Sequence, residues 1–279
     1  MVAEIFHAGE RYVQDRLGQA DIAQRVGRGI GRQIPYAAAE FLAEQPLVVI
    51  GARDAEGCVW ASPLIGAPGF VRVVDYDVIE IDVELTTGER LADALRGRVS
   101  IGLIALEPET RRRMRVNGVS EPTERGIRIT AEQVYSNCPK YISRRPLDVG
   151  GPGHTGPTFR QGLELDPQQQ DTIRAAETFF IATTDRDGNA DASHRGGNAG
   201  FLQVLSPTRL RWPDYRGNSM FMTLGNIMVN PAAGLWVPDR ATGASLSISG
   251  NAELNWDYGD EPGAQLLIDF TVTDVVQRP

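Results

Sequence analysis

One short segment of the sequence combines residues that can bind an anion. Ser193, His194 and Arg195 are followed directly by Gly196 and Gly197. Glycine lets backbone N–H groups approach an anion closely, and an arginine guanidinium offers paired donors to a phosphate. A short segment of this kind is also typical of a solvated hairpin turn, so the rest of the chain has to decide between the two interpretations.

A second polar segment follows and leads into a predicted helix near residues 218–229. It contains Pro213, Asp214, Tyr215, Gly217 and Asn218. The N-terminus of a helix favours an anion, because its first amides have no partner within the helix. Thr223 and Asn226 are three residues apart and share one face of this helix. The alternative interpretation is an ordinary capped helix.

Two segments of the first half carry further polar residues. Arg113 and Arg115 alternate along a predicted strand and therefore share a face, where they form either a binding surface or a solvated basic edge. Asn137, Lys140 and Tyr141 lie in the sequence NCPKYI, where a tyrosine beside a lysine can line a pocket for a ring. The alternative there is a linker with a packed tyrosine.

The sequence repeats itself at a constant offset of 131 residues. Residues 54–70 align with residues 185–201, including five glycine, aspartate and phenylalanine matches. Within the repeat, the apolar residues 63–65 of the first copy are replaced by the polar residues 194–196. Two copies of this length indicate a duplicated domain. Because only the second copy has polar residues at this place, the binding interpretation is favoured. The sequence then predicts a pseudo-dimer with one working site.

Both copies share the same order of predicted elements. A helix over 34–45 leads into a strand over 47–52, and a helix that starts at Asp166 and Pro167 leads into a strand over 179–184. Short alternating strands with Gly and Asp turns follow in each copy, which is typical of antiparallel barrels. The Gly- and Pro-rich stretch between the copies predicts a linker, which gives domains at 1–144 and 163–279 with the linker at 145–162.

Composition narrows the class of protein. The 279 residues fit two domains of ordinary size, and the net charge of −8 argues against general nucleic-acid binding. No apolar run is long enough to span a membrane and the N-terminus has no apolar signal core, so a cytoplasmic protein is expected. Two cysteines and three scattered histidines do not predict a metal site. Cys138 is interpreted as a packing residue rather than a nucleophile.

The segments SHRGGNAGF, WPDYRGN, MTLGN, VNPAAGLW, LSISGNAEL and NCPKYISRR occur in an order that resembles the pyridoxamine 5′-phosphate oxidase-like superfamily of FMN-binding split barrels. The chain is most similar to the flavin-barrel proteins often fused to ferredoxin-reductase modules. The resemblance implies a mainly β fold of two tandem six-stranded split β-barrels that form an intramolecular pseudo-dimer. It also implies one FMN in the barrel interface.

The resemblance assigns roles residue by residue. Arg195 and its glycines would lie near the flavin phosphate, and Thr223 stands where many members place a phosphate-binding Lys or Ser. Gly225 and Ala232 depart from the pattern, since relatives frequently carry Arg there. The second copy ends where NCPKYI would begin, so one interface would be complete and the other would not. The predicted cofactor-binding residues are Ser193, His194, Arg195, Gly196, Gly197, Pro213, Asp214, Tyr215, Gly217, Asn218, Thr223, Asn226, Arg113, Arg115, Asn137, Lys140 and Tyr141.

The function implied is that of an FMN-dependent oxidoreductase acting on a small organic substrate. Electrons would come from the substrate, from NAD(P)H or from a separate reductase. His194 is a candidate proton donor, with a structural role as the alternative. The rival functions are a non-catalytic flavin carrier or sensor, and a related barrel that binds haem or F420. The chain is expected to act as a monomeric pseudo-dimer or a homodimer, without nucleic-acid or membrane partners.

Overall fold

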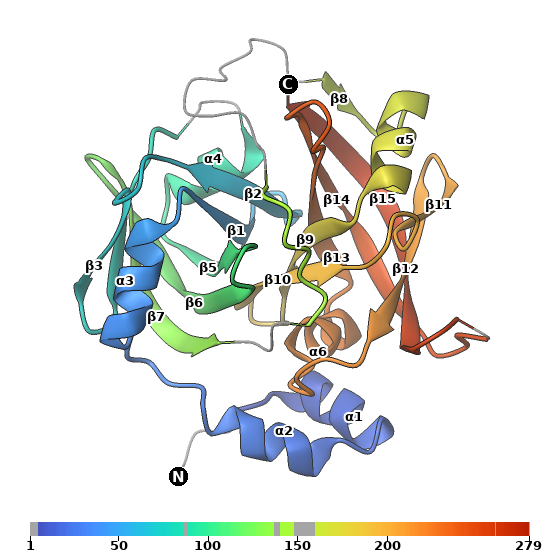
Figure 1. Ribbon diagram of the computed structural model, residues 1–279, viewed down its shortest axis with the longest axis horizontal. Coiled ribbons are helices and arrows are strands. Elements are labelled where there is room, and N and C mark those ends of the chain that lie inside the picture. Colours follow the sequence, from blue (N-terminus) through green and yellow to red (C-terminus); the bar gives the residue numbers. More distant parts are fainter. Residues whose placement is uncertain (1–4, 86–88, 137–139, 148–159, 260, 279) are drawn as a thin grey trace.

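The computed structural model describes residues 5–85, 89–136, 140–147, 160–259 and 261–278, and it contains two antiparallel β-barrels packed side by side (Figure 1). Short helices lie at the ends of the barrels. They are α1 (Ala8–Arg16), α2 (Ala20–Gly27), α3 (Tyr36–Glu44), α4 (Arg90–Leu95), α5 (Pro167–Ala175) and α6 (Met222–Val229). The predicted mainly β fold of two tandem split barrels is confirmed.

The first barrel is a seven-stranded sheet with the strand order β2-β1-β5-β6-β7-β4-β3. Every pairing in it is antiparallel. Its strands are β1 (Leu47–Arg53), β2 (Val59–Ile65), β3 (Val71–Asp75), β4 (Val78–Asp82), β5 (Val99–Glu107), β6 (Arg112–Thr123) and β7 (Gly126–Ser136).

The second barrel repeats this order as β10-β9-β13-β14-β15-β12-β11, and β8 adds to β15. Its strands are β8 (Arg160–Gly162), β9 (Thr178–Thr184), β10 (Ala190–Gly196), β11 (Gln203–Ser206), β12 (Arg209–Tyr215), β13 (Ala232–Pro238), β14 (Ser245–Asn255) and β15 (Ala264–Arg278). The identical order confirms the duplication. The six strands expected for each barrel are too few, because the short hairpin strands β3 and β11 also join the sheets. The strand β8 occupies the last three residues of the segment predicted as linker.

The two helices that precede the first strands begin as the sequence predicts. Asp166 caps α5: its carboxylate accepts from the Gln169 N–H at 2.9 Å, and the Gln169 side chain accepts from the Asp166 N–H at 3.0 Å. The chain then passes from α5 into β9, as it passes from α3 into β1. These short helices fix where β1 and β9 enter the sheets, and therefore the positions of β2 and β10 that pair with them.

The two barrels meet through strands that approach too closely for side chains at two glycines. A Cβ atom at Gly102 would lie 2.3 Å from the backbone nitrogen of Ala192, and one at Gly234 would lie 2.5 Å from the Val59 carbonyl oxygen. The two glycines occupy equivalent places in the repeat, so the contact obeys a pseudo-twofold relation. Buried apolar side chains from both barrels complete this interface, among them Val49 and Ile104 of the first barrel and Phe180 and Trp236 of the second.

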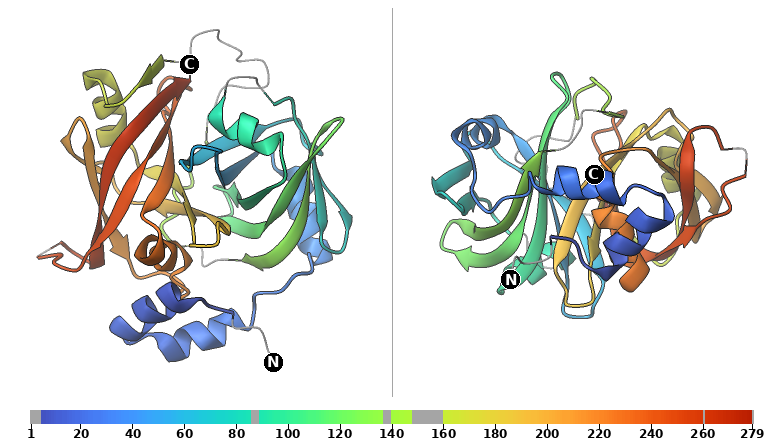
Figure 2. Two further views of the ribbon diagram at one scale, coloured as in Figure 1. Left: turned by 180° about the vertical axis from the view of Figure 1, so that it is seen from behind. Right: turned by 90° about the horizontal axis from the view of Figure 1, so that it is seen from below.

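Helices α1 and α2 connect to both barrels. The predicted first domain, residues 1–144, includes both helices, whereas α1 packs against α6 of the second barrel, as the view from below in Figure 2 shows. A Cβ atom at Gly225 would lie 2.2 Å from Cγ of Glu10, and one at Gly9 would lie 2.2 Å from the Gly225 carbonyl oxygen. The departure from the superfamily pattern at Gly225 thus makes room for α1. Gly31, after α2, pairs with Val134 of β7 in the first barrel.

Candidate functional site

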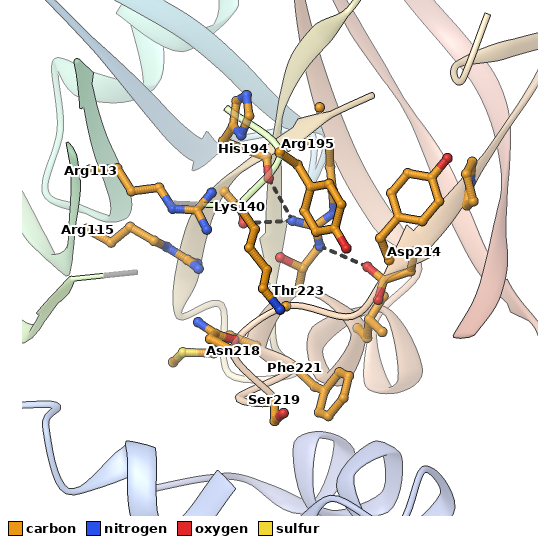
Figure 3. A pocket seen from close by; sticks show the side chains of 18 of the residues that line it. Arg113, Arg115, Lys140, His194, Arg195, Asp214, Asn218, Ser219, Phe221 and Thr223 are labelled. Atoms are coloured by element: carbon orange, nitrogen blue, oxygen red, sulfur yellow. Dashed lines mark hydrogen bonds and ion pairs between the residues drawn. The ribbon is translucent and has the colours of Figure 1, made fainter. Parts of the chain in front are cut away.

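A pocket lies at the junction of the barrels and receives side chains from both (Figure 3). We call it the interface pocket. Its lining residues are Arg113, Arg115, Lys140, Tyr141, Ser193, His194, Arg195, Gly196, Phe201, Pro213, Asp214, Tyr215, Gly217, Asn218, Ser219, Phe221, Met222, Thr223 and Leu224. Strand β10, the end of β12 and the start of α6 supply the second-barrel side, and β6 and the segment after β7 supply the first-barrel side.

Strand β10 presents Ser193 and Arg195 on one face. The Arg195 guanidinium donates to Ser193 Oγ at 2.8 Å and lies 3.7 Å from a carboxylate oxygen of Asp214. Burial raises the pKa of Asp214, and the nearby Arg195 opposes that shift. The Nε atom of Arg195 is buried and has no hydrogen-bond partner among the described residues. The site therefore holds a partly buried cation whose Nε has no partner among the described residues.

His194 has a different environment from its neighbours on β10. Its ring is 5% exposed, packs against Phe180 and forms a 2.6 Å hydrogen bond between Nε2 and the Thr178 hydroxyl. Burial lowers the pKa of His194 well below its ordinary value, and the surrounding arginines lower it further. The imidazole is therefore neutral near pH 7 and is held by contacts inside the second barrel.

The first barrel contributes Arg113 and Arg115, whose side chains extend from β6 toward the middle of the pocket in Figure 3. The Arg115 guanidinium forms a buried ion pair with Asp191 of β10, on the other barrel. The Asp191 carboxylate also accepts from Tyr135 at 3.0 Å and from Asn117 at 3.1 Å. Asp191 therefore holds one wall of the pocket and fixes the two barrels relative to each other.

The segment after β7 closes the pocket over β10. The Tyr141 ring stacks on that of Tyr215, with centroids 5.3 Å apart. A Cβ atom at Gly196 would lie 2.1 Å from the Tyr141 carbonyl oxygen, so glycine is required for this approach. Tyr141, Ser219 and Phe221 all have positive φ angles, of 61°, 64° and 60°. Strained backbone of this kind gathers at functional sites, and here it shapes one pocket.

The N-terminus of α6 faces the same pocket. Its first residues, Met222 and Thr223, line the pocket, and no side chain of the described residues caps the helix. An uncapped helix N-terminus presents backbone donors and a partial positive charge. The Thr223 hydroxyl donates to the Asp191 carboxylate at 3.5 Å and so supports the wall of the pocket. The pocket thus combines backbone donors with the cationic side chains of both barrels.

The structure brings most of the predicted site residues together, with three exceptions. Asn226 lies away from the interface pocket and bonds His7 and Thr183 instead. Gly197 is absent from the lining, because its place is packed against the ring of Phe201. Asn137 lies outside the described residues. Five lining residues were not predicted from the sequence: Phe201, Ser219, Phe221, Met222 and Leu224. Phe201 could have been found from the repeat, because a Gly-Phe pair ends the aligned segment in both copies. Nothing in the sequence indicates the positive φ angles at Ser219 and Phe221.

The pseudo-twofold relation places an equivalent position on the opposite side of the interface. There Ser62 stands for Ser193, Leu64 for Arg195 and Ser247 for Arg115. The position is filled by an ion pair between Arg278 and Glu89, and Arg278 also donates to Ser62 at 3.4 Å. The cavity left there is about 10 Å³, compared with about 90 Å³ in the interface pocket. Ten cubic ångströms is about the space of one water molecule.

Two tandem split barrels with a pocket in their interface define the class of fold. The family model described as Pyridoxamine 5′-phosphate oxidase matches residues 165–266, which lie in the second barrel. This match bears out, over the second barrel, the resemblance of the sequence to the pyridoxamine 5′-phosphate oxidase-like superfamily. A search of curated proteins found no match.

Among solved structures, the chain is similar to a HupZ variant from Group A Streptococcus, with 14% identity over 40% of this chain and 98% of that one at a TM-score of 0.34. An FMN-binding protein from Syntrophomonas wolfei shows 10% identity over 41% of this chain and 88% of its own, at a TM-score of 0.29. The haem storage protein HutZ from Vibrio cholerae shows 15% identity over 41% of this chain and 95% of its own, at a TM-score of 0.28.

Among the described residues, no group of three or more His, Cys, Asp or Glu side chains is arranged to hold a metal ion. None of the described helices is both long and apolar enough to cross a membrane.

Proposed function

We propose that the protein is an FMN-dependent oxidoreductase that binds one flavin in the interface pocket and acts on a small organic substrate. The observation that carries the proposal is the donor set of this pocket. Among the described residues, the buried Nε of Arg195 has no partner and no side chain caps the α6 N-terminus. Lys140 and Arg113 line the first-barrel side of the same pocket. Such a set suits a phosphate group, because guanidinium groups and helix N-termini both bind phosphate oxygens.

The aromatic side of the pocket suits the flavin ring system. Tyr141 and Tyr215 come from different barrels and are stacked across the opening. A cavity of about 90 Å³ is smaller than the 300–1,000 Å³ usual for ligand sites, so we expect the half-exposed Tyr141 to swing aside when the cofactor enters. A larger cavity elsewhere in the molecule is lined by several carboxylates, and its charge is unsuitable for a phosphate.

FMN would supply the electron transfer, and the protein would bind, orient and tune it. In this proposal Arg195, Lys140 and the first turn of α6 hold the phosphate. Arg115, fixed by Asp191, keeps a positive charge in the wall of the pocket. For His194 we propose the structural alternative. Its buried imidazole is neutral near pH 7 and bonds the Thr178 hydroxyl, so it positions β10 rather than donating a proton.

A visible spectrum of the purified protein tests the cofactor first. Flavin absorbance would support the proposal, whereas a haem Soret band or a deazaflavin spectrum would contradict it. Flavin released by acid, measured against protein, should give one FMN per chain, since the pseudo-symmetric position is filled by Arg278 and Glu89. Turnover with NAD(P)H or with a separate reductase would distinguish an enzyme from a flavin carrier or sensor.

A further inference from the structure

A second and larger cavity lies between the N-terminal helices and both barrels. Its volume is about 700 Å³, within the range usual for small-molecule sites. We call it the acidic cavity. The carboxylates that line it are Glu10, Glu132, Asp185 and Asp191. Asp191 is neutralised by Arg115, and Arg32 is the one Lys or Arg among the described lining residues, so acidic groups outnumber basic groups.

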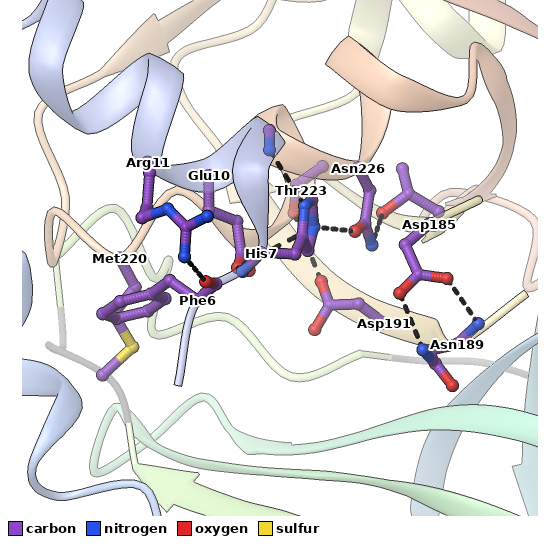
Figure 4. A network of polar contacts seen from close by, with 12 residues as sticks. Phe6, His7, Glu10, Arg11, Asp185, Asn189, Asp191, Met220, Thr223 and Asn226 are labelled. Carbon is purple, nitrogen blue, oxygen red and sulfur yellow. Dashed lines mark hydrogen bonds and ion pairs between the residues drawn. The ribbon is translucent and has the colours of Figure 1, made fainter. Parts of the chain in front are cut away.

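Glu10 is the most buried acidic group among the described residues of the N-terminal helices, with a side chain that is 3% exposed. Its carboxylate accepts from the His7 backbone N–H at 2.8 Å (Figure 4). The His7 ring nitrogen is 3.8 Å away, too far for a hydrogen bond. Burial raises the pKa of Glu10 to about 8, and Asp191 and Asp185 add to this shift. No side chain of the described residues donates a hydrogen bond to this carboxylate.

Asn117 provides a second unsatisfied acceptor on the cavity wall. Its Nδ2 donates to Gln133 at 3.0 Å and to Asp191 at 3.1 Å. Both partners are acceptor oxygens, so the amide cannot be reversed. Its Oδ1 is buried and has no hydrogen-bond partner among the described residues. Leaving a buried acceptor unpaired costs free energy, which a ligand donor would recover.

The remaining wall is partly apolar, with Phe6, Ile30 and Met222 among its residues. An alkyl ammonium group has donors and no acceptor, and its chain can contact apolar side chains. A bare metal ion is less suitable, because the described residues contain no cluster of three metal-ligating side chains. We propose that the acidic cavity binds a small organic cation, through an ammonium or guanidinium group that pairs with Glu10 and Asn117.

The test is isothermal titration calorimetry of the full-length protein with putrescine, agmatine and spermidine. We expect saturable binding of at least one amine at one site. Glu10→Gln should weaken it at least tenfold, because the carboxylate charge is lost. The matched control is Glu109→Gln, an exposed acid at a turn of the first barrel, which should bind like wild type. The uncharged 1,4-butanediol should not bind.

A second readout needs no variant. Glu10 must lose its proton when it pairs with a cation, so binding at pH 7 should release about one proton per site, measured in two buffers of different ionisation enthalpy. Three results would each overturn the proposal: no saturable binding by any of the three amines, equal affinities of the Glu10→Gln and Glu109→Gln variants, or binding without proton release. Magnesium ion binding that is as tight and equally dependent on Glu10 would also overturn it.

Discussion

Arg115 on β6 and Asp191 on β10 form a buried ion pair that joins the two barrels. Their side chains are 5% and 4% exposed. At the equivalent positions of the repeat stand Ser247 and Trp60, so the pair exists on one side of the pseudo-twofold interface only. We predict that Asp191→Asn costs about 3–5 kcal/mol of unfolding free energy, since it leaves a buried guanidinium without its counter-charge.

Urea unfolding measures this change. The matched control is Arg98→Ala, which breaks the exposed pair with Glu121. That change should cost less than about 1 kcal/mol. Equal costs for the two variants would show that the buried pair does not hold the barrels together.

Arg195→Ala should weaken FMN binding far more than Leu64→Ala does. The arginine has buried donor capacity in the interface pocket, and a charge-assisted contact is worth on the order of 2–3 kcal/mol. Leu64 occupies the equivalent position on the filled side. Its truncation should instead lower stability by about 2–4 kcal/mol, because the side chain is buried. Fluorescence titration with FMN and urea unfolding of both variants check this, and unchanged FMN affinity in Arg195→Ala would contradict the assignment.

Gly225→Ala should destabilise the packing of α1 on α6 by about 1–3 kcal/mol, since overpacked contacts force the backbone apart. The added Cβ would lie 2.2 Å from Cγ of Glu10. Gly217→Ala is the control, because the nearest atom to its Cβ would be 4.0 Å away. Thermal unfolding compares the two. A Gly225→Ala variant as stable as the control would mean that α1 adjusts at no cost.

Stability should fall as the pH rises from about 6.5 to 9, by about 2 kcal/mol, owing to Glu10. The pKa of this carboxyl is raised to about 8 in the folded protein, above its ordinary value of 4.5. The stabilising protonated form is therefore present at low pH and lost as the pH passes through the folded pKa. Glu10→Gln should abolish this component, which urea unfolding at several pH values measures. An identical pH dependence in the variant would rule Glu10 out as its source.

The repeat made much of this structure predictable from the sequence. The offset of 131 residues places β2 on β10 residue for residue, and the capping pair at Asp166 marks the start of α5. The contrast between Leu64 and Arg195 distinguished the two sides of the interface. Local patterns of this kind are visible because they involve residues close together in the chain.

The features of the fold and site that the sequence did not predict depend mostly on contacts between segments far apart in the chain. Asp191 receives donors from Arg115, Asn117 and Tyr135, all of the other barrel, and nothing near it in the sequence indicates them. Asn226 lies outside the lining of the interface pocket because of another distant contact, with His7 of the N-terminal segment. Gly197 lies outside it for a local reason, since it accommodates the ring of Phe201 four residues later.

The ion pair of Arg278 with Glu89 has a consequence for how this protein differs from a dimer of separate barrels. In a symmetric homodimer every substitution appears at both interfaces, so a side chain that blocks one pocket blocks the other. Joining the barrels in one chain removes that constraint. One interface can then be specialised for structural support while its counterpart stays open to ligands, and substitutions at either can accumulate independently.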